Sequence, residues 1–265
     1  MKRDGLLVCR GCGMSRAVEP VFHEPGYEGL DKRDIYLSSK RRVINSLVGE
    51  LRRFIPSGGR LLDIGCASGE LMKAARAAGW DCYGVEISGA LAERSRAAGF
   101  TVYNGAIEDY SGRTEVDAVV FYEVLSQMND PRGALDRAFS LLRKGGMVFI
   151  REFNASFHLR ALSLSGSLPL RLLGLRPGVV HNWNFTPAAM HALLERSGFD
   201  SIEVRNARPS SGDPYGTGGR LGPLAVSVFK KIHFTLASLV SALSGGRSLI
   251  SSVFEARARK PGSDS

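Results

Sequence analysis

A turn of small residues lies near the middle of the chain, directly after a short apolar run. Asp63-Ile-Gly-Cys-Ala-Ser-Gly69 has small side chains at 65, 67 and 69, which let the backbone turn sharply and let a ligand approach closely. The helix predicted to follow offers free N–H groups at its N-terminus. Glu86 ends the next predicted strand, where an acid can accept both hydroxyls of a ribose. Together these residues predict a binding site for a ribose-bearing cofactor.

The elements that must position this turn alternate between strands and helices. Short apolar runs predict strands at 60–64, 82–86, 101–103, 116–121 and 147–150. Helical spacing predicts helices over 70–78 and 90–98, and a third that begins at Pro131 and ends at Gly145-Gly146. Two later strands are predicted at 201–205 and 252–258. The pattern predicts an α/β fold with a doubly wound, mostly parallel seven-stranded sheet and an antiparallel final strand.

The composition is that of a globular protein. Hydrophobic residues make up 44% and charged residues 23% of the 265 residues, which excludes a largely disordered chain, a coiled coil and a collagen-like repeat. Four cysteines are too few for a disulfide scaffold, and the first residues show no signal-peptide core, so a cytoplasmic location is expected. The net charge of +9 lies outside residues 61–150. It suits nucleic acid, an anionic membrane, a phosphorylated substrate or merely a solvated surface.

Five segments resemble the motifs of the class I S-adenosylmethionine-dependent methyltransferases. Leu61-Leu-Asp-Ile-Gly-Cys-Ala-Ser-Gly69 resembles the D/E-x-G-x-G-x-G motif, and 85–88, 105–109, 117–130 and 141–148 resemble later ones. The resemblance extends over about 35–205. It implies a Rossmann-like methyltransferase fold, S-adenosyl-L-methionine as cofactor and no metal. The residues that it implies bind the cofactor are Asp63, Gly65, Cys66, Ala67, Gly69, Glu86, Ile87, Ile107, Glu108 and Phe121.

The sequence departs from the family pattern in three places. Ala67 replaces the middle glycine, which the turn tolerates if the φ of Ala67 is negative. Ala106 stands where many relatives carry an aspartate near the adenine. Ser126-Gln127 replaces a common Glu-His pair, so the family supplies no general base for this chain. The candidate bases in the sequence are Glu123, after the fourth strand, His158, after the fifth, and His181, before a helix expected at 186–187. For each of the three, a packing, capping or surface role is the alternative.

The two ends of the chain suggest an arm and a helical cap. Residues 1–34 are expected to form an N-terminal arm, and 35–265 the methyltransferase domain, with cap insertions at about 156–180 and 206–250. Cys9-Arg-Gly-Cys12 resembles one zinc knuckle of related sugar methyltransferases. A tetrahedral zinc site needs four ligands, so bound zinc is not expected at Cys9 and Cys12.

Residues 224–243 have the pattern of a basic amphipathic helix. Apolar residues share one helical face, but Lys230 and Lys231 lie near the middle of the run. Lysine at a bilayer centre is unfavourable by roughly 2.5–3.5 kcal/mol, so the helix should not span a membrane. It can instead lie on the inner membrane surface as a peripheral contact, cover an apolar substrate, or pack on the domain as an ordinary helix.

The expected function is methyl transfer from S-adenosyl-L-methionine to an oxygen of a small or lipid-linked acceptor. This acceptor class follows from the resemblance of the core to quinone-biosynthesis O-methyltransferases. A sugar C- or O-methyltransferase is the first alternative, and a non-catalytic cofactor-binding module is another. Nucleic acid is not an expected partner, because the sequence contains no RNA-binding module.

Overall fold

The computed structural model describes residues 2–3, 5–19, 30–112, 114–164, 181–211 and 222–262. The chain divides into two compact units. The first contains Met1–Val43, Glu152–Met190 and Arg205–Glu255. The second contains Ile44–Arg151, His191–Val204 and Ala256–Ser265. The parts of the predicted caps at 165–180 and 212–221 lie outside the described residues.

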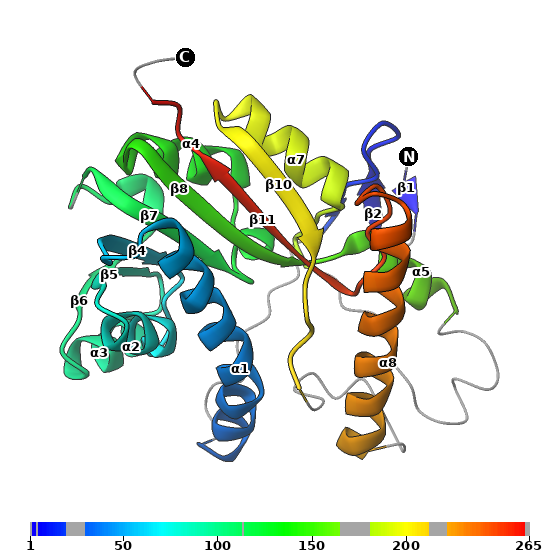
Figure 1. The fold of residues 1–265 in the computed structure, drawn as a ribbon, viewed down its shortest axis with the longest axis horizontal. Helices are drawn as coiled ribbons and strands as arrows, with labels where there is room; N and C mark the ends of the chain where they lie inside the picture. Colours follow the sequence, from blue (N-terminus) through cyan, green and yellow to red (C-terminus); the bar gives the residue numbers. More distant parts are fainter. Residues whose placement is uncertain are drawn as a thin grey trace. The chain divides into compact units, whose positions relative to one another are not determined.

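A seven-stranded sheet organises the structure, in the order β10-β11-β8-β7-β4-β5-β6 (Figure 1). The neighbours from β8 through β7, β4 and β5 to β6 pair in parallel. Strand β11 is antiparallel to both of its neighbours, since its residue numbers fall as theirs rise. On the β8 side, Gly145 N–H donates to Lys260 O and Asn154 N–H to Ser252 O. On the β10 side, Ala207 N–H donates to Val253 O and Arg257 Nε donates to Glu203. The strands are β4 (Arg60–Ile64), β5 (Asp81–Glu86), β6 (Thr101–Asn104), β7 (Val116–Tyr122), β8 (Leu142–Phe153), β10 (Asp200–Asn206) and β11 (Val253–Arg259). The predicted fold class and antiparallel final strand are confirmed.

The strand order explains how helices reach both faces of the sheet. The chain moves outward from β4 to β5 and β6, and then returns to the other side of β4 for β7 and β8. Right-handed crossovers therefore place α2 and α3 on one face and α4 on the other. A ligand binds such a sheet where the order reverses, at the carboxyl end of its central strands. The helices are α1 (Leu30–Phe54), α2 (Glu70–Ala77), α3 (Gly89–Ala97), α4 (Pro131–Leu141) and α7 (Pro187–Arg196).

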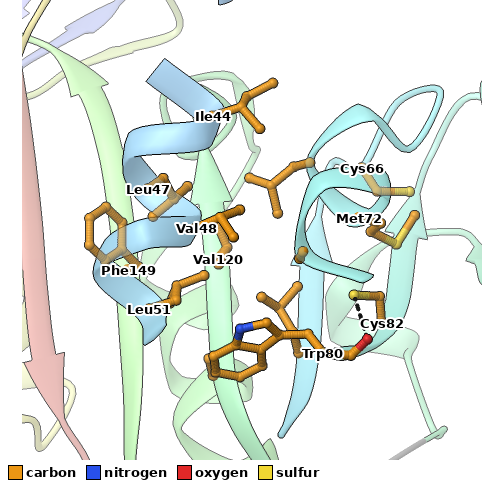
Figure 2. Close-up of a cluster of buried hydrophobic side chains, with 14 of the residues drawn as sticks. Ile44, Leu47, Val48, Leu51, Cys66, Met72, Trp80, Cys82, Val120 and Phe149 are labelled. Carbon is orange, nitrogen blue, oxygen red and sulfur yellow. Dashed lines mark hydrogen bonds between the residues drawn. The ribbon is translucent and has the colours of Figure 1, made fainter. Parts of the chain in front are cut away.

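One hydrophobic cluster holds α1 and α2 against the sheet in the second unit (Figure 2). Leu47 and Leu51 of α1 are buried with Phe149 of β8 and Val120 of β7. Met72 of α2 is fully buried in the same cluster. Burial of side chains of this size stabilises the fold by about 1.5–3 kcal/mol each, which gives the cofactor turn between β4 and α2 a rigid base.

One predicted boundary is wrong. Gly145-Gly146 does not end the helix: α4 ends at Leu141, and both glycines lie within the twelve-residue strand β8. The register of β8 against β7 shifts between the pairs Val116–Leu142 and Ala118–Met147. The glycines occupy this irregularity, where Gly145 has a φ of 71°. A glycine pair after a helix therefore marks an irregularity in strand pairing rather than the end of the helix.

The first unit contains a smaller sheet, in the order β1-β2-β3-β9. The N-terminal strands pair with a segment far along the chain: β3 lies beside β9, and the two strands are antiparallel. The unit also contains two helices of the predicted cap, α5 and α8. The bounds of these elements are β1 (Lys2–Arg3), β2 (Leu6–Val8), β3 (Ser15–Ala17), β9 (Trp183–Asn184), α5 (Ala155–Leu164) and α8 (Gly222–Leu243).

Candidate cofactor and acceptor sites

Three alternate residues of the turn after β4 have left-handed backbone. The φ angles are 70° at Gly65, 48° at Ala67 and 82° at Gly69. The condition under which the turn would tolerate alanine at 67 without strain, a negative φ, is therefore not met. Alanine in this region is less favourable than glycine by roughly 1–2 kcal/mol, so the turn contains strain that a glycine would relieve.

The two glycines of the turn also make room for neighbouring side chains. A Cβ on Gly65 would lie 2.6 Å from Val124 Cγ2, and one on Gly69 would lie 2.6 Å from Ser95 Oγ of α3. Gly84 of β5 makes similar room for Cys66, whose Sγ would lie 2.6 Å from an added Cβ. These glycines are thus needed for packing as well as for ligand approach, and a larger residue at 65 would strain the fold and the site together.

Glu86 connects the two loops that surround the predicted ribose position. Its Oε2 accepts the N–H of Ala67 at 2.9 Å, and its Oε1 accepts the N–H of Ser88 at 2.9 Å. Each oxygen retains a further lone pair, because a carboxylate has about four acceptor sites. The carboxylate is therefore fixed in place and still able to accept ribose hydroxyls.

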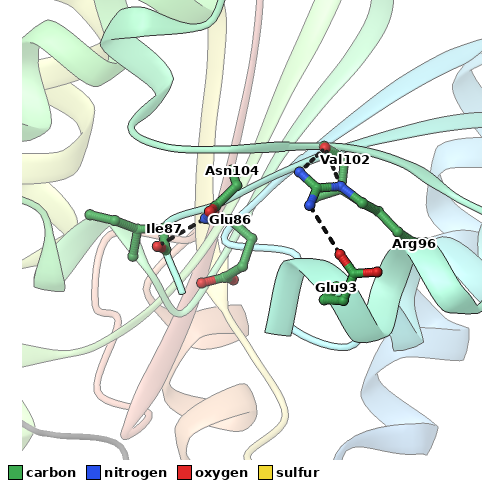
Figure 3. Close-up of polar contacts among 6 residues, drawn as sticks. All are labelled: Glu86, Ile87, Glu93, Arg96, Val102 and Asn104. Carbon is green, nitrogen blue, oxygen red and sulfur yellow. Dashed lines mark hydrogen bonds and ion pairs between the residues drawn. The ribbon is translucent and has the colours of Figure 1, made fainter. Parts of the chain in front are cut away.

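Asn104 is a positioning residue that the sequence reasoning missed. Its Nδ2 donates to Glu86 O at 2.8 Å and to Ile87 O at 3.1 Å (Figure 3). The bond from the end of β6 therefore fixes the carboxyl end of β5. The side chain of Ile87, next to Glu86, is 77% exposed. An apolar side chain in this position is suited to pack against one face of an adenine.

Asp63 gives the site its electrostatic character. The side chain is buried, and burial together with the nearby charge of Glu86 raises the pKa of Asp63 well above its usual range. Burial also raises the pKa of the adjacent Cys66 thiol, with Asp63 and Glu86 adding to the effect. Carboxylates crowded in this way favour a cationic ligand. The sulfonium and ammonium groups of S-adenosyl-L-methionine fit this requirement, and its ribose fits Glu86.

The other predicted cofactor residues differ in accessibility. Ile107 and Phe121 have buried side chains, 2% and 0% exposed. Their contribution to a ligand site is therefore through the backbone or by packing. Glu108 is exposed in the short 3-10 turn Ile107–Asp109, where its carboxylate can reach solvent or a ligand.

Glu123 forms a buried ion pair rather than an open acid. Arg151 Nε donates to Glu123 Oε1 at 3.1 Å, and both side chains are buried. The φ of Glu123 is 56°, and its N–H donates to Arg151 O at 2.8 Å. The pair compensates the charge of Glu123, which favours a positioning role over proton removal. Glu152, fully buried at the next position along β8, is a further acid that the sequence reasoning did not single out.

His158 and His181 lie together around one aromatic ring in the first unit. The Phe153 ring centroid is 5.3 Å from each of the two imidazole centroids. His158 Nε2 lies 2.9 Å from Ser252 O, and since a carbonyl can only accept, Nε2 carries the proton and Nδ1 is the acceptor. Burial lowers the pKa of His158 to about 4, so its ring is neutral at pH 7. Asn184 fixes the His181 backbone from both sides: Oδ1 accepts the N–H at 3.0 Å and Nδ2 donates to the carbonyl at 2.9 Å.

Cys9 and Cys12 lie in the hairpin between β2 and β3. Cys9 is exposed, and hydrogen bonds from the backbone of Cys12 and Gly11 lower the pKa of its thiol. Among the described residues, no group of three or more His, Cys, Asp or Glu side chains is arranged to hold a metal ion. The hairpin therefore presents two thiols without the remaining ligands of a zinc site within the described part of the chain.

The comparisons with known proteins agree with this geometry. Residues 36–204 match the family described as a methyltransferase domain. The chain belongs to this methyltransferase family and is an S-adenosylmethionine-dependent enzyme of the Rossmann-like class.

A curated relative is the ubiquinone biosynthesis O-methyltransferase of Xanthomonas axonopodis pv. citri. It is 27% identical over 163 residues, which cover 57% of this chain and 67% of the relative. A solved S-adenosylmethionine-dependent methyltransferase from Archaeoglobus fulgidus has a TM-score of 0.52 and 18% identity, covering 83% of this chain and 94% of that one. The plantazolicin methyltransferase BamL has a TM-score of 0.54 and 14% identity, with 87% of each chain covered. The two solved structures share the fold of this chain.

Replacing Ala67 by glycine should stabilise the protein. The substitution removes the left-handed strain of alanine but adds backbone freedom to the unfolded chain, so we expect the free energy of unfolding to rise by up to about 1 kcal/mol. Urea denaturation followed by circular dichroism measures this change. Ala77→Gly, near the end of α2 where the backbone is helical, is the matched control and should destabilise. A lower free energy of unfolding for Ala67→Gly would contradict the inference that the backbone of Ala67 is strained.

Glu86→Ala should weaken cofactor binding, because it removes an acceptor of charge-assisted hydrogen bonds. The expected loss is about 1.5–3 kcal/mol, roughly 10- to 150-fold in affinity. Glu86→Gln should lose affinity as well, because one of its two terminal atoms becomes a donor facing a backbone N–H. Calorimetric titration with S-adenosyl-L-methionine measures both, and Glu93→Ala, on the exposed side of α3, should bind as the wild type does. Equal affinity in all variants would remove Glu86 from the site.

The burial of neutral His158 predicts a pH-dependent stability. The pKa of His158 is lowered from 6.5 to about 4, so the unfolded chain binds a proton more readily than the folded protein between these values. The stabilisation is complete above about pH 6.5 and is lost as the pH falls towards 4, by about 3 kcal/mol in total. Urea denaturation across this range measures the loss. His158→Gln should flatten that part of the profile, while the exposed His191→Gln should leave it unchanged.

Proposed function

We propose that this enzyme methylates a hydroxyl oxygen of a small acceptor that carries an apolar tail, as a lipid-linked phenol does. The observation that supports this proposal most directly is the cluster of Phe153, His158 and His181, which combines aromatic surface with neutral imidazole nitrogen. The similarity to ubiquinone biosynthesis O-methyltransferases supports the same acceptor class.

Different residues of the chain are assigned to cofactor binding and to the acceptor. When bound, S-adenosyl-L-methionine supplies a methyl group already activated by the sulfonium. Glu86 holds the ribose end and the buried Asp63 favours the positive end. The enzyme must then align the acceptor oxygen and remove its proton, which contributes a factor of about 10²–10⁴ in rate.

We assign the proton removal to His181 and the alignment of the acceptor to His158. His158 is too weak a base for this step because its pKa is about 4, yet its Nδ1 can accept a hydrogen bond from a hydroxyl. His181 is held by Asn184 through its backbone, which orients the ring on Phe153. Glu123 is assigned to positioning, through its pair with Arg151.

A sugar C- or O-methyltransferase is the second candidate. It is favoured by the Cys9–Cys12 hairpin, which resembles part of the zinc module of such enzymes. A non-catalytic cofactor-binding module is the third, and its sequence basis is the replacement of the Glu-His pair by Ser126-Gln127.

The experiment is methyl transfer from labelled S-adenosyl-L-methionine to an alkylated catechol, with His181→Gln as the test variant. We expect kcat to fall by about 10²–10⁴ without loss of cofactor affinity. His191→Gln changes an exposed histidine of α7 and should retain full activity.

Three results would redirect the assignment. Transfer to a nucleotide sugar but not to the catechol would favour the second candidate. Cofactor binding without any transfer would favour the third. Full activity of His181→Gln would exclude His181 as the base.

A further inference from the structure

The apolar side of α8 faces away from the protein. Val228, Ile232, Leu236 and Leu239 recur at three- and four-residue spacing and so share one side of the helix; all four are exposed, Leu236 by 54% and Leu239 by 56%. Residues 224–243 form a helix that is long and apolar enough to cross a membrane. Only 11% of its apolar stretch is buried in the protein. An ordinary packed helix buries its apolar side, so α8 presents about 30 Å of apolar surface to an external partner.

The other side of α8 contacts the rest of the first unit through polar groups. Lys230 Nζ donates to Ser210 O at 3.4 Å, and Asn206 Nδ2 donates to Ala237 O at 2.9 Å. His233 Nε2 donates to Ile250 O at 3.1 Å. A spanning orientation would carry these polar groups into hydrocarbon, which is strongly unfavourable. The contacts therefore favour an orientation in which α8 lies along a surface.

The charge around α8 selects the kind of surface. The sequence contains no Asp or Glu between Asp213 and Glu255, while Lys230, Lys231 and Arg247 lie in the same stretch. Lys231 and Arg247 are exposed. This stretch contains no acidic residue to neutralise Lys231 and Arg247. An anionic lipid surface, which offers both apolar depth and negative charge, therefore suits α8 better than a second copy of it does.

We propose that α8 attaches the enzyme to anionic membranes, lying in the interface with Val228, Ile232, Leu236 and Leu239 among the acyl chains.

A series of ring contacts connects α8 with His158, one of the residues assigned to the acceptor. The ring centroids of Phe229 and His233 are 6.0 Å apart, those of His233 and Phe157 4.7 Å, and those of Phe157 and His158 5.1 Å. The attachment goes beyond the proposed function and does not depend on it. It identifies the membrane as the place where a lipid-linked acceptor is met.

The test is flotation of the purified protein with vesicles of phosphatidylcholine, with and without phosphatidylglycerol, at low salt. The wild type should float with the anionic vesicles and much less with the neutral ones. Ile232→Gln together with Leu236→Gln should lower the partition coefficient at least tenfold, because both side chains leave the acyl region. Leu7→Gln, an equally exposed apolar residue of the first unit, is the matched control and should bind as the wild type does.

A charge reversal tests the electrostatic part. Lys231→Glu should lower binding to anionic vesicles several-fold, while Lys144→Glu, at an exposed position of β8 in the second unit, should not. Cofactor affinity should stay unchanged in every variant, which shows that each is folded.

Two outcomes would overturn the attachment. One is a wild type that ignores anionic vesicles at low salt. The other is a wild-type dimer, seen by analytical ultracentrifugation, that becomes a monomer in the Ile232→Gln, Leu236→Gln variant, since α8 would then be a self-association surface. Failure of the proposed acceptor chemistry is seen separately, in the catechol assay without vesicles.

Discussion

The hydrogen bonds of the Glu86 carboxylate are the interactions on which the candidate cofactor site depends. One oxygen fixes the turn after β4 through Ala67, and the other fixes the turn after β5 through Ser88. The turn after β4 borders the point where the strand order reverses, between β4 and β7, and the connections that leave for opposite faces there leave room for a ligand. A single buried acid thus links the two loops and keeps lone pairs that can accept the hydroxyls of a ribose.

The charges of the two units are suited to different ligands. In the second unit, Asp63 and Glu86 are crowded together at the end of the sheet, and the pKa of Asp63 rises in response. A cationic ligand relieves this crowding. In the first unit, the neutral His158 and its ring neighbours suit an uncharged, aromatic or apolar molecule. The charged environment of the candidate cofactor site therefore differs from the neutral, aromatic environment of the cluster formed by Phe153, His158 and His181.

The helix α8 shows why an apolar period does not identify a buried face. Residues 224–243 have helical spacing of apolar side chains, which a packed lid and a membrane-surface helix share. The structure attaches the opposite side of the helix to the first unit, through groups such as Lys230 and Ala237. Lys230 therefore belongs to the protein-facing side, and Lys231 remains exposed.

The sequence alone determined the sheet and its central strands, and it located the turn expected to bind the cofactor, because local periodicity, glycine spacing and an acid at a strand end are all local signals. It could not determine the backbone of Ala67, since whether alanine is forced to a φ of 48° depends on the contacts that hold the turn. It also could not separate the three candidate bases. Glu123 forms an ion pair with Arg151 of the neighbouring strand β8, and the rings of His158 and His181 both lie against the ring of Phe153. Such pairings join residues distant along the chain, so only the tertiary structure decided them.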